Sequence, residues 1–270
     1  MRVTLAFSLL LSVLAGAATA QPTQEGFPGR AEFPEVPVIE IGELRQRLGK
    51  VVIVDTRSEY EYQTLSIKGA VNIPVAAKDF EARLKALRAR SGDPIVFYCN
   101  GRSCFKSYQA VKRAVKASVA KTLAFDAGMF EWAQAYPDLA VLLGESPVRQ
   151  SDIIPGADFR KRLLAPEQFS EEAYNMGRQA LILDVRDKYQ RAGVGFFPGK
   201  ERWVSLDQTE RLKGYIDQAK REQRTLFIYD EVGKQVRWLQ YALKDAGVSN
   251  YYFMKKGAKG FYTEVVGAPQ

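Results

Sequence analysis

The chain contains no histidine and only two cysteines among its 270 residues, Cys99 and Cys104. Without histidine it has no Ser–His or Cys–His catalytic pair and no histidine-based metal site, and two cysteines alone do not complete a structural zinc site. Neither standard glycine-rich phosphate loop is present. We therefore expect no metal and no cofactor, and a cysteine thiolate is the strong nucleophile that remains.

No hydrophobic run is long enough to cross a bilayer, which takes about 20 apolar residues. The N-terminal run covers only residues 5–14, with Arg2 before it and small residues at 18–20. This arrangement is typical of a cleaved secretory signal. We expect a signal peptide over residues 1–20 with cleavage after Ala20, a periplasmic or secreted protein, and no stable membrane anchor.

The charge is unbalanced toward the positive side, with 39 Lys and Arg against 31 Asp and Glu and a formal net charge of +8. A basic surface favours anionic partners in general. The Lys and Arg residues recur mostly on the polar faces of predicted helices. They do not alternate with aromatic residues as they do in nucleic-acid-binding modules. We expect a solvated basic surface and no nucleic-acid partner.

Short apolar runs alternate with amphipathic stretches, and the order occurs twice. The landmarks that end the apolar runs are Asp55 and Cys99 in the first half, 44 positions apart, and Asp184 and Asp230 in the second, 46 positions apart. Such agreement indicates an internal duplication, and strands that alternate with helices predict mostly parallel sheets covered by helices. The predicted fold class is α/β, with an arm or linker at 21–35 and two domains at 36–145 and 150–267.

Cys99 follows directly on the predicted buried strand 95–98 and precedes an amphipathic helix. Ligands of open α/β sheets bind at the carboxyl ends of strands. Loop N–H groups, the helix dipole and the nearby Arg102 and Lys106 all favour the thiolate. The sequence thus predicts a nucleophilic Cys99 beside an anion site. A disulfide with Cys104 is disfavoured, because so short a loop removes little entropy from the unfolded chain.

Four motifs of the first half occur together. They are the Asp-x-Arg strand end at Asp55 and Arg57, the turn from Gly69 to Pro74, the cysteine loop from Cys99 to Cys104, and the closure at Gly128 and Trp132. In combination they resemble the rhodanese domain, the sulfurtransferase module. The second half resembles a diverged copy that keeps Asp184, Arg186, Gly199 and Gly257. One departure is Ser66, which stands about where this family usually carries a histidine.

The resemblance implies that Cys99 takes a sulfur from an anionic donor such as thiosulfate, forms a persulfide, and passes the sulfur to a thiol acceptor, either a small molecule or a protein, or to cyanide. The residues implied in binding the donor and the persulfide are Asn100, Gly101, Arg102, Ser103, Cys104 and Lys106. Asp55 and Arg57 are expected to brace the loop and the sheet by an ion pair. The second copy carries Asp230 in place of Cys99 and is expected to be catalytically silent, because a carboxylate forms no persulfide.

Two other functions remain open, and a third, a phosphatase or arsenate reductase, is disfavoured. A phosphatase or arsenate reductase of related fold needs an arginine six positions after the cysteine, and Phe105 occupies that place. A redox or sulfur-relay protein would use Cys104 to attack a persulfide or sulfenic acid on Cys99 and leave a disulfide. Two binding modules with a vestigial Cys99 are the second open alternative.

Overall fold

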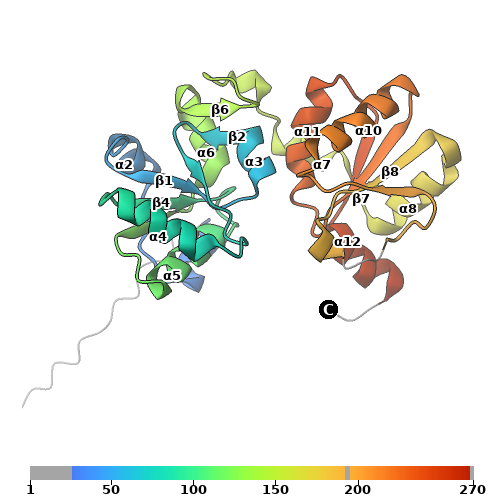
Figure 1. Ribbon diagram of the computed structural model, residues 1–270. Helices are drawn as coiled ribbons and strands as arrows, with labels where there is room; N and C mark the ends of the chain where they lie inside the picture. The colour runs from blue at the N-terminus through green and yellow to red at the C-terminus, as the bar shows by residue number, and fades with distance from the viewer. Residues whose placement is uncertain (1–25, 192–194, 268–270) are drawn as a thin grey trace, which may run out of the picture.

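The computed structural model of the chain describes residues 26–191 and 195–267, so the predicted signal peptide over 1–20 lies outside the described residues. Two α/β units lie side by side, each built on its own parallel sheet (Figure 1). Within the described ranges, no helix is both long and apolar enough to cross a membrane.

The first unit is a four-stranded parallel sheet with helices on both faces. Its strands, in spatial order, are β3 (Val71–Asn72), β1 (Val52–Asp55), β4 (Ile95–Tyr98) and β5 (Thr122–Phe125). Helices α4 (Phe80–Arg90) and α5 (Lys106–Lys116) pack on one face; α2 (Ile41–Gln46), α3 (Glu59–Thr64) and α6 (Gly128–Ala135) pack on the other. A separate antiparallel pair joins β2 (Leu65–Ile67) to β6 (Ala140–Leu142). The continuous apolar strands are buried because helices cover both faces.

The second unit is a five-stranded parallel sheet. Its strands, in spatial order, are β9 (Glu201–Trp203), β8 (Ala180–Asp184), β10 (Thr225–Tyr229), β11 (Tyr251–Met254) and β7 (Leu163–Leu164). Its helices are α7 (Gly156–Arg160), α8 (Pro166–Asn175), α9 (Lys188–Arg191), α10 (Thr209–Arg221), α11 (Val236–Asp245) and α12 (Gly257–Phe261). The order β9-β8-β10-β11 matches β3-β1-β4-β5 of the first unit. The predicted α/β class, with parallel sheets flanked by helices, is confirmed.

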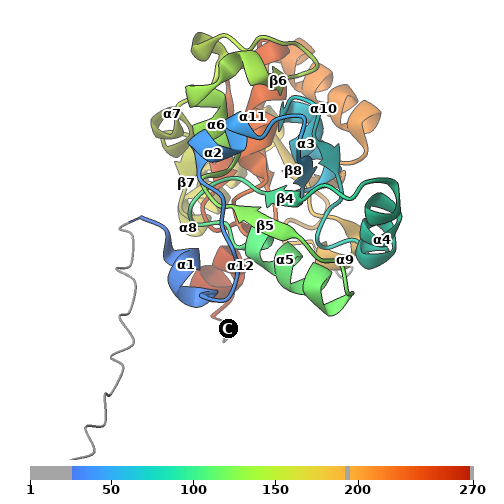
Figure 2. The same ribbon diagram turned by 90° about the vertical axis from the view of Figure 1, so that its left-hand side faces the viewer.

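The segment expected to be a linker or arm, residues 21–35, is partly helical and docked on the first unit. Helix α1 (Pro28–Glu32) lies beside α5 (Figure 2). Arg30 Nε donates to Asp126 Oδ2 at 2.8 Å, and the ring of Phe33 stacks on Tyr108 with centroids 5.3 Å apart. The described part of this segment is therefore integral to the first unit, because an ion pair and an aromatic stack hold it there.

The two units meet at Trp238, a fully buried residue of α11. Its ring stacks on Phe130 of α6 with centroids 4.8 Å apart, and the guanidinium of Arg57 lies 4.8 Å from the same ring. The guanidinium of Arg237 lies over the Phe130 ring, 3.6 Å from its centroid. Because Arg57 also contacts the loop of Cys99, this interface lies close to the candidate site.

Candidate functional site

Cys99 is placed by the end of β4, and the loop that it opens runs to the start of α5 at Lys106. Gly128 packs against this loop and has a φ of +70. A Cβ added at Gly128 would overlap the backbone of Gly101 and Asn100. Only glycine suits both the left-handed conformation and the close approach. Met129 N donates to Cys99 O at 2.9 Å. The loop conformation is therefore fixed by β4 and by the N-terminus of α6 together.

The structure joins Cys99 to Cys104 by a disulfide, the arrangement that the sequence disfavoured. The two Cα atoms lie 6.4 Å apart, within the usual range for a disulfide. The loop turns back on itself, since Cys104 N donates to Gly101 O at 2.8 Å, and this brings the sulfurs together despite the short separation in sequence. Cys99 is only 1% exposed. The structure thus shows the oxidised pair and not the resting thiolate expected from the sequence.

The two cations predicted to attract an anionic donor have carboxylate partners. Arg102 donates to both carboxylate oxygens of Glu131, at 2.5 and 2.8 Å, and this hydrogen bonding raises the pKa of Arg102. Lys106 Nζ lies 3.8 Å from Glu61 Oε2. Sequence reasoning missed both glutamates. The two glutamates thus partly neutralise the positive charges of Arg102 and Lys106. Ser103, next to Arg102, is an exposed residue of the same loop.

Asp55 and Arg57 form a fully buried ion pair, with Arg57 Nη2 2.6 Å from Asp55 Oδ2. Burial alone would lower the pKa of Arg57, but the Asp55 carboxylate raises it above its ordinary value. The guanidinium also donates to Leu65 O at 2.6 Å and to Asn100 Oδ1 at 3.1 Å. Arg57 therefore connects β1, the α3–β2 junction and the first loop residue after Cys99.

Glu61 is a buried carboxylate that reaches the same loop. It is 1% exposed and accepts a hydrogen bond from Asn100 Nδ2 at 3.0 Å. Burial acts to raise the pKa of Glu61, but the charges of Lys106 and Arg57 hold it below its ordinary value. Asn100 is thus bound at both ends of its side-chain amide. The Ser58-x-x-Glu61 pattern signals a helix start, but it carries no information about the loop that Glu61 contacts.

Asp230 occupies the corresponding place after β10 and shows what such a loop can hold. Its carboxylate is fully buried and accepts four backbone hydrogen bonds, from Val232, Gly233, Gln235 and Val236. Burial raises the pKa of Asp230, and the four amide hydrogen bonds act to lower it. At equal offsets from Cys99 the amides belong to Gly101, Arg102, Cys104 and Phe105. The second loop is therefore a cradle for an anion, filled by its own side chain.

Replacing Asp230 by asparagine is expected to lower the free energy of unfolding by about 2–4 kcal/mol, because an amide NH₂ accepts no hydrogen bonds and leaves buried N–H groups unpaired. Urea denaturation followed by tryptophan fluorescence measures this loss. The matched control is Asp245→Asn at the exposed end of α11, with an expected change within about 0.5 kcal/mol. Equal stability of the two variants would contradict the role given to the Asp230 carboxylate.

Part of the chain is similar to a known protein family. Residues 40–135 match the family described as Rhodanese-like domain. An HTH-type transcriptional regulator of Mycobacterium tuberculosis is 40% identical over 101 residues, which make up 37% of this chain and 42% of the regulator. The match thus spans about two fifths of that relative's length.

Two solved structures show partial similarity. A thiosulfate sulfurtransferase from Pseudomonas aeruginosa is 20% identical, with 85% of this chain and 44% of that chain covered and a TM-score of 0.36. A human single-domain sulfurtransferase is 27% identical, with 37% of this chain and 96% of that chain covered and a TM-score of 0.31. The family match at residues 40–135 includes β1, β4 and the whole loop of Cys99. The family match therefore falls on the first unit of the chain.

Proposed function

We propose that the protein is a sulfurtransferase that carries sulfane sulfur on Cys99. The observation that carries this proposal is the position of Cys99 at the end of a central parallel strand, at the start of a loop whose counterpart after β10 binds an anion through its backbone amides. Such a loop stabilises a thiolate and equally an anionic persulfide. The match of residues 40–135 to the rhodanese-like domain supports the same chemistry.

The proposed reaction has two steps. The Cys99 thiolate attacks the outer sulfur of thiosulfate, the sulfur–sulfur bond of the donor breaks, and sulfite leaves with the electron pair. An acceptor thiolate, or cyanide in an assay, then attacks the outer sulfur of the persulfide, and Cys99 leaves again as a thiolate. Asp55, Arg57 and Glu61 hold the loop and take no part in these bonds.

The disulfide adds a requirement to this scheme. Cys99 can attack a donor only after its bond to Cys104 is reduced, which an external thiol does by exchange through a mixed disulfide. Cys104 is the more exposed of the two residues. We propose attack there, because Cys99 then leaves as the thiolate that the loop stabilises.

The remaining parts of the proposal concern the setting of the reaction. The donor is a small anion and the acceptor a small-molecule or protein thiol, without a nucleic-acid partner or a membrane anchor. The protein acts in the periplasm or outside the cell after cleavage behind Ala20. The second unit is a diverged copy that turns over no substrate, a view supported by the equal strand order and by Asp230 in the nucleophile's place.

One observation favours a second candidate function, a thiol redox or sulfur-relay protein. The disulfide shows that Cys104 reaches Cys99 without rearrangement of the loop. In a relay, the Cys104 thiolate attacks the inner sulfur of a Cys99 persulfide, hydrosulfide leaves, and the disulfide forms. That outcome would discharge each persulfide instead of passing its sulfur to an acceptor.

Intact-protein mass spectrometry tests the main proposal. The chain is reduced, freed of reductant and treated with thiosulfate. The expected result is a mass gain of one sulfur atom that disappears after cyanide is added. A sample kept oxidised is the control and should gain nothing. Absence of the gain from fully reduced protein would overturn the sulfurtransferase assignment.

A further inference from the structure

The segment 26–33, which we call the strap, is docked on the first unit beside α5 (Figure 2). Gly29 lies directly on the ring of Tyr108, and a Cβ at this position would overlap the ring carbons. Tyr108 cannot give way, because it is fully buried and its hydroxyl donates to Asp126 Oδ2 at 2.5 Å. Arg30 Nη2 donates to Oδ1 of the same carboxylate at 3.1 Å. Docking of the strap therefore requires a glycine at position 29.

The strap also contacts the second half of the cysteine loop. The ring of Phe27 lies against the guanidinium of Arg102, which is 4.3 Å from the ring centroid. The rings of Phe33 and Phe105 meet edge to face, with centroids 5.7 Å apart. Arg102 and Phe105 stand two positions before and one position after Cys104. The strap therefore holds the chain on both sides of Cys104.

The two halves of the loop are held in different ways. In the first half, Asn100 binds the buried side chains of Arg57 and Glu61 through both ends of its amide. In the second half, the ion pair of Arg102 and Glu131 lies at the surface, with side chains 46% and 33% exposed. Exposed ion pairs contribute little to stability. The second half is therefore the part of the loop that can open, and opening breaks its contacts with the strap.

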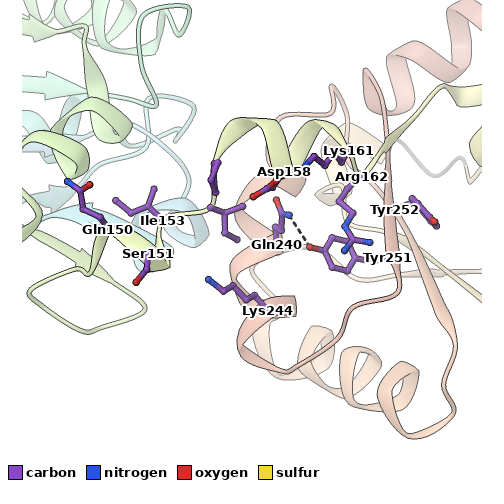
Figure 3. A pocket seen from close by; sticks show the side chains of 12 residues that line it. Gln150, Ser151, Ile153, Asp158, Lys161, Arg162, Gln240, Lys244, Tyr251 and Tyr252 are labelled. Atoms are coloured by element: carbon purple, nitrogen blue, oxygen red, sulfur yellow. Dashed lines mark hydrogen bonds and ion pairs between the residues drawn. The ribbon is translucent and has the colours of Figure 1, made fainter.

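Cys99 is closed off from solvent while the loop keeps this conformation. Its exposed fraction is 1%, and both sulfur transfer and thiol exchange at Cys99 require direct contact between an incoming atom and its sulfur. The cavity of about 750 Å³ beside the connection between the two units gives no entrance, because no residue of the cysteine loop lines it (Figure 3). Access to Cys99 therefore depends on opening of the loop.

We propose that the strap is a lid on the cysteine loop, whose contacts keep the second half of the loop closed and whose release exposes Cys99. The strap makes these contacts with the closed loop and loses them when the loop opens, so docking of the strap and closure of the loop favour each other. The consequence for the rate of sulfur transfer rests on the function proposed above, whereas the exposure of the cysteine does not.

Alkylation of Cys99 by iodoacetamide tests the proposal on the full chain in the Cys104→Ser background, where one thiol remains and no disulfide forms. The thiolate displaces iodide, and intact-protein mass spectrometry follows the adduct over time. The probe carries no charge, so the cations near the loop do not attract it. The rate is measured against pH, because its plateau above the pKa of the thiol depends on access and not on the thiolate fraction.

Gly29→Ala places a Cβ in the Tyr108 ring and detaches the strap, so it is expected to raise the plateau rate about tenfold. Phe27→Leu removes the ring that contacts Arg102 and is expected to raise the rate about threefold. Gly42→Ala is the matched control. It adds the same methyl group to a helix of the same unit, α2, where the group meets open space, and it should leave the rate unchanged.

Circular dichroism checks that each variant is folded, and Phe27→Leu supplies the test if Gly29→Ala does not fold. A plateau rate equal to that of the parent protein in either folded strap variant overturns the proposal. An equal rise in Gly42→Ala overturns it too, since the unit would then be loosened in general. The alkylation involves no sulfur transfer, so failure of the lid and failure of the sulfurtransferase assignment are distinguishable.

Discussion

Replacement of Cys99 by alanine is expected to lower the rate of sulfur transfer from thiosulfate to cyanide by at least about 10³-fold, because the reaction loses its only nucleophile. The rate is measured on reduced protein as thiocyanate formed over time. Cys99 has a small, buried side chain, so we expect alanine to keep the fold, which circular dichroism checks. Residual activity near that of the wild type would place the chemistry elsewhere in the chain.

The companion variant, Cys104→Ser, separates the two candidate functions. A sulfurtransferase keeps its turnover without Cys104, and it no longer needs prior reduction because the disulfide cannot form. A relay instead accumulates the Cys99 persulfide and releases no hydrosulfide. Retained thiocyanate formation would favour the transferase, whereas a stable persulfide with abolished turnover would favour the relay.

Replacement of Arg57 by methionine is expected to lower the free energy of unfolding by about 3–5 kcal/mol, the usual effect of removing one partner from a buried ion pair. The change leaves the Asp55 carboxylate buried without its partner and removes the donors to Leu65 O and Asn100 Oδ1. Urea denaturation of variant and wild type measures the difference. A second expected effect is slower sulfur transfer, since Asn100 loses one of its two anchors.

The matched control is Arg149→Met. Arg149 also pairs with an aspartate, Asp152, at 2.8 Å, but its side chain is 80% exposed. Exposed pairs contribute little, so the expected loss is below about 1 kcal/mol. If both arginine variants lost the same stability, burial would not be what makes the Arg57 pair important.

Central strands of the fold could be predicted from the sequence because they are continuous apolar runs with a defined end, whereas edge strands such as β9 (Glu201–Trp203) carry no such run. The predicted buried strand 95–98 is a strand with the same bounds in the structure. The helical spacing of apolar residues predicted less well which of them are buried. Val115 has the helical spacing of the apolar face of α5, yet it is 63% exposed. It lies in the last turn of α5, and periodicity alone does not tell whether another element covers that turn.

The sequence by itself determined that the chain has one strong candidate nucleophile and where it lies. The lack of histidine is read from the composition, and the apolar run before Cys99 is a local pattern. A cysteine at the end of a buried strand can therefore be recognised without reference to any distant residue. The tertiary structure decided what surrounds it. Glu61 and Glu131 are 38 and 32 positions from Cys99, and they meet its loop only because α3 and α6 pack on the same sheet face.

Only the tertiary structure, too, showed the disulfide of Cys99 and the contact between the second unit and Arg57. The loop brings Cys99 to Cys104 by turning around Gly101, held there by Gly128, and sequence separation alone suggested the opposite. Trp238 lies 139 positions from Cys99, yet it covers the arginine that holds the loop. Such contacts depend on how two separately folded sheets dock, and a pattern along one chain carries no record of that geometry.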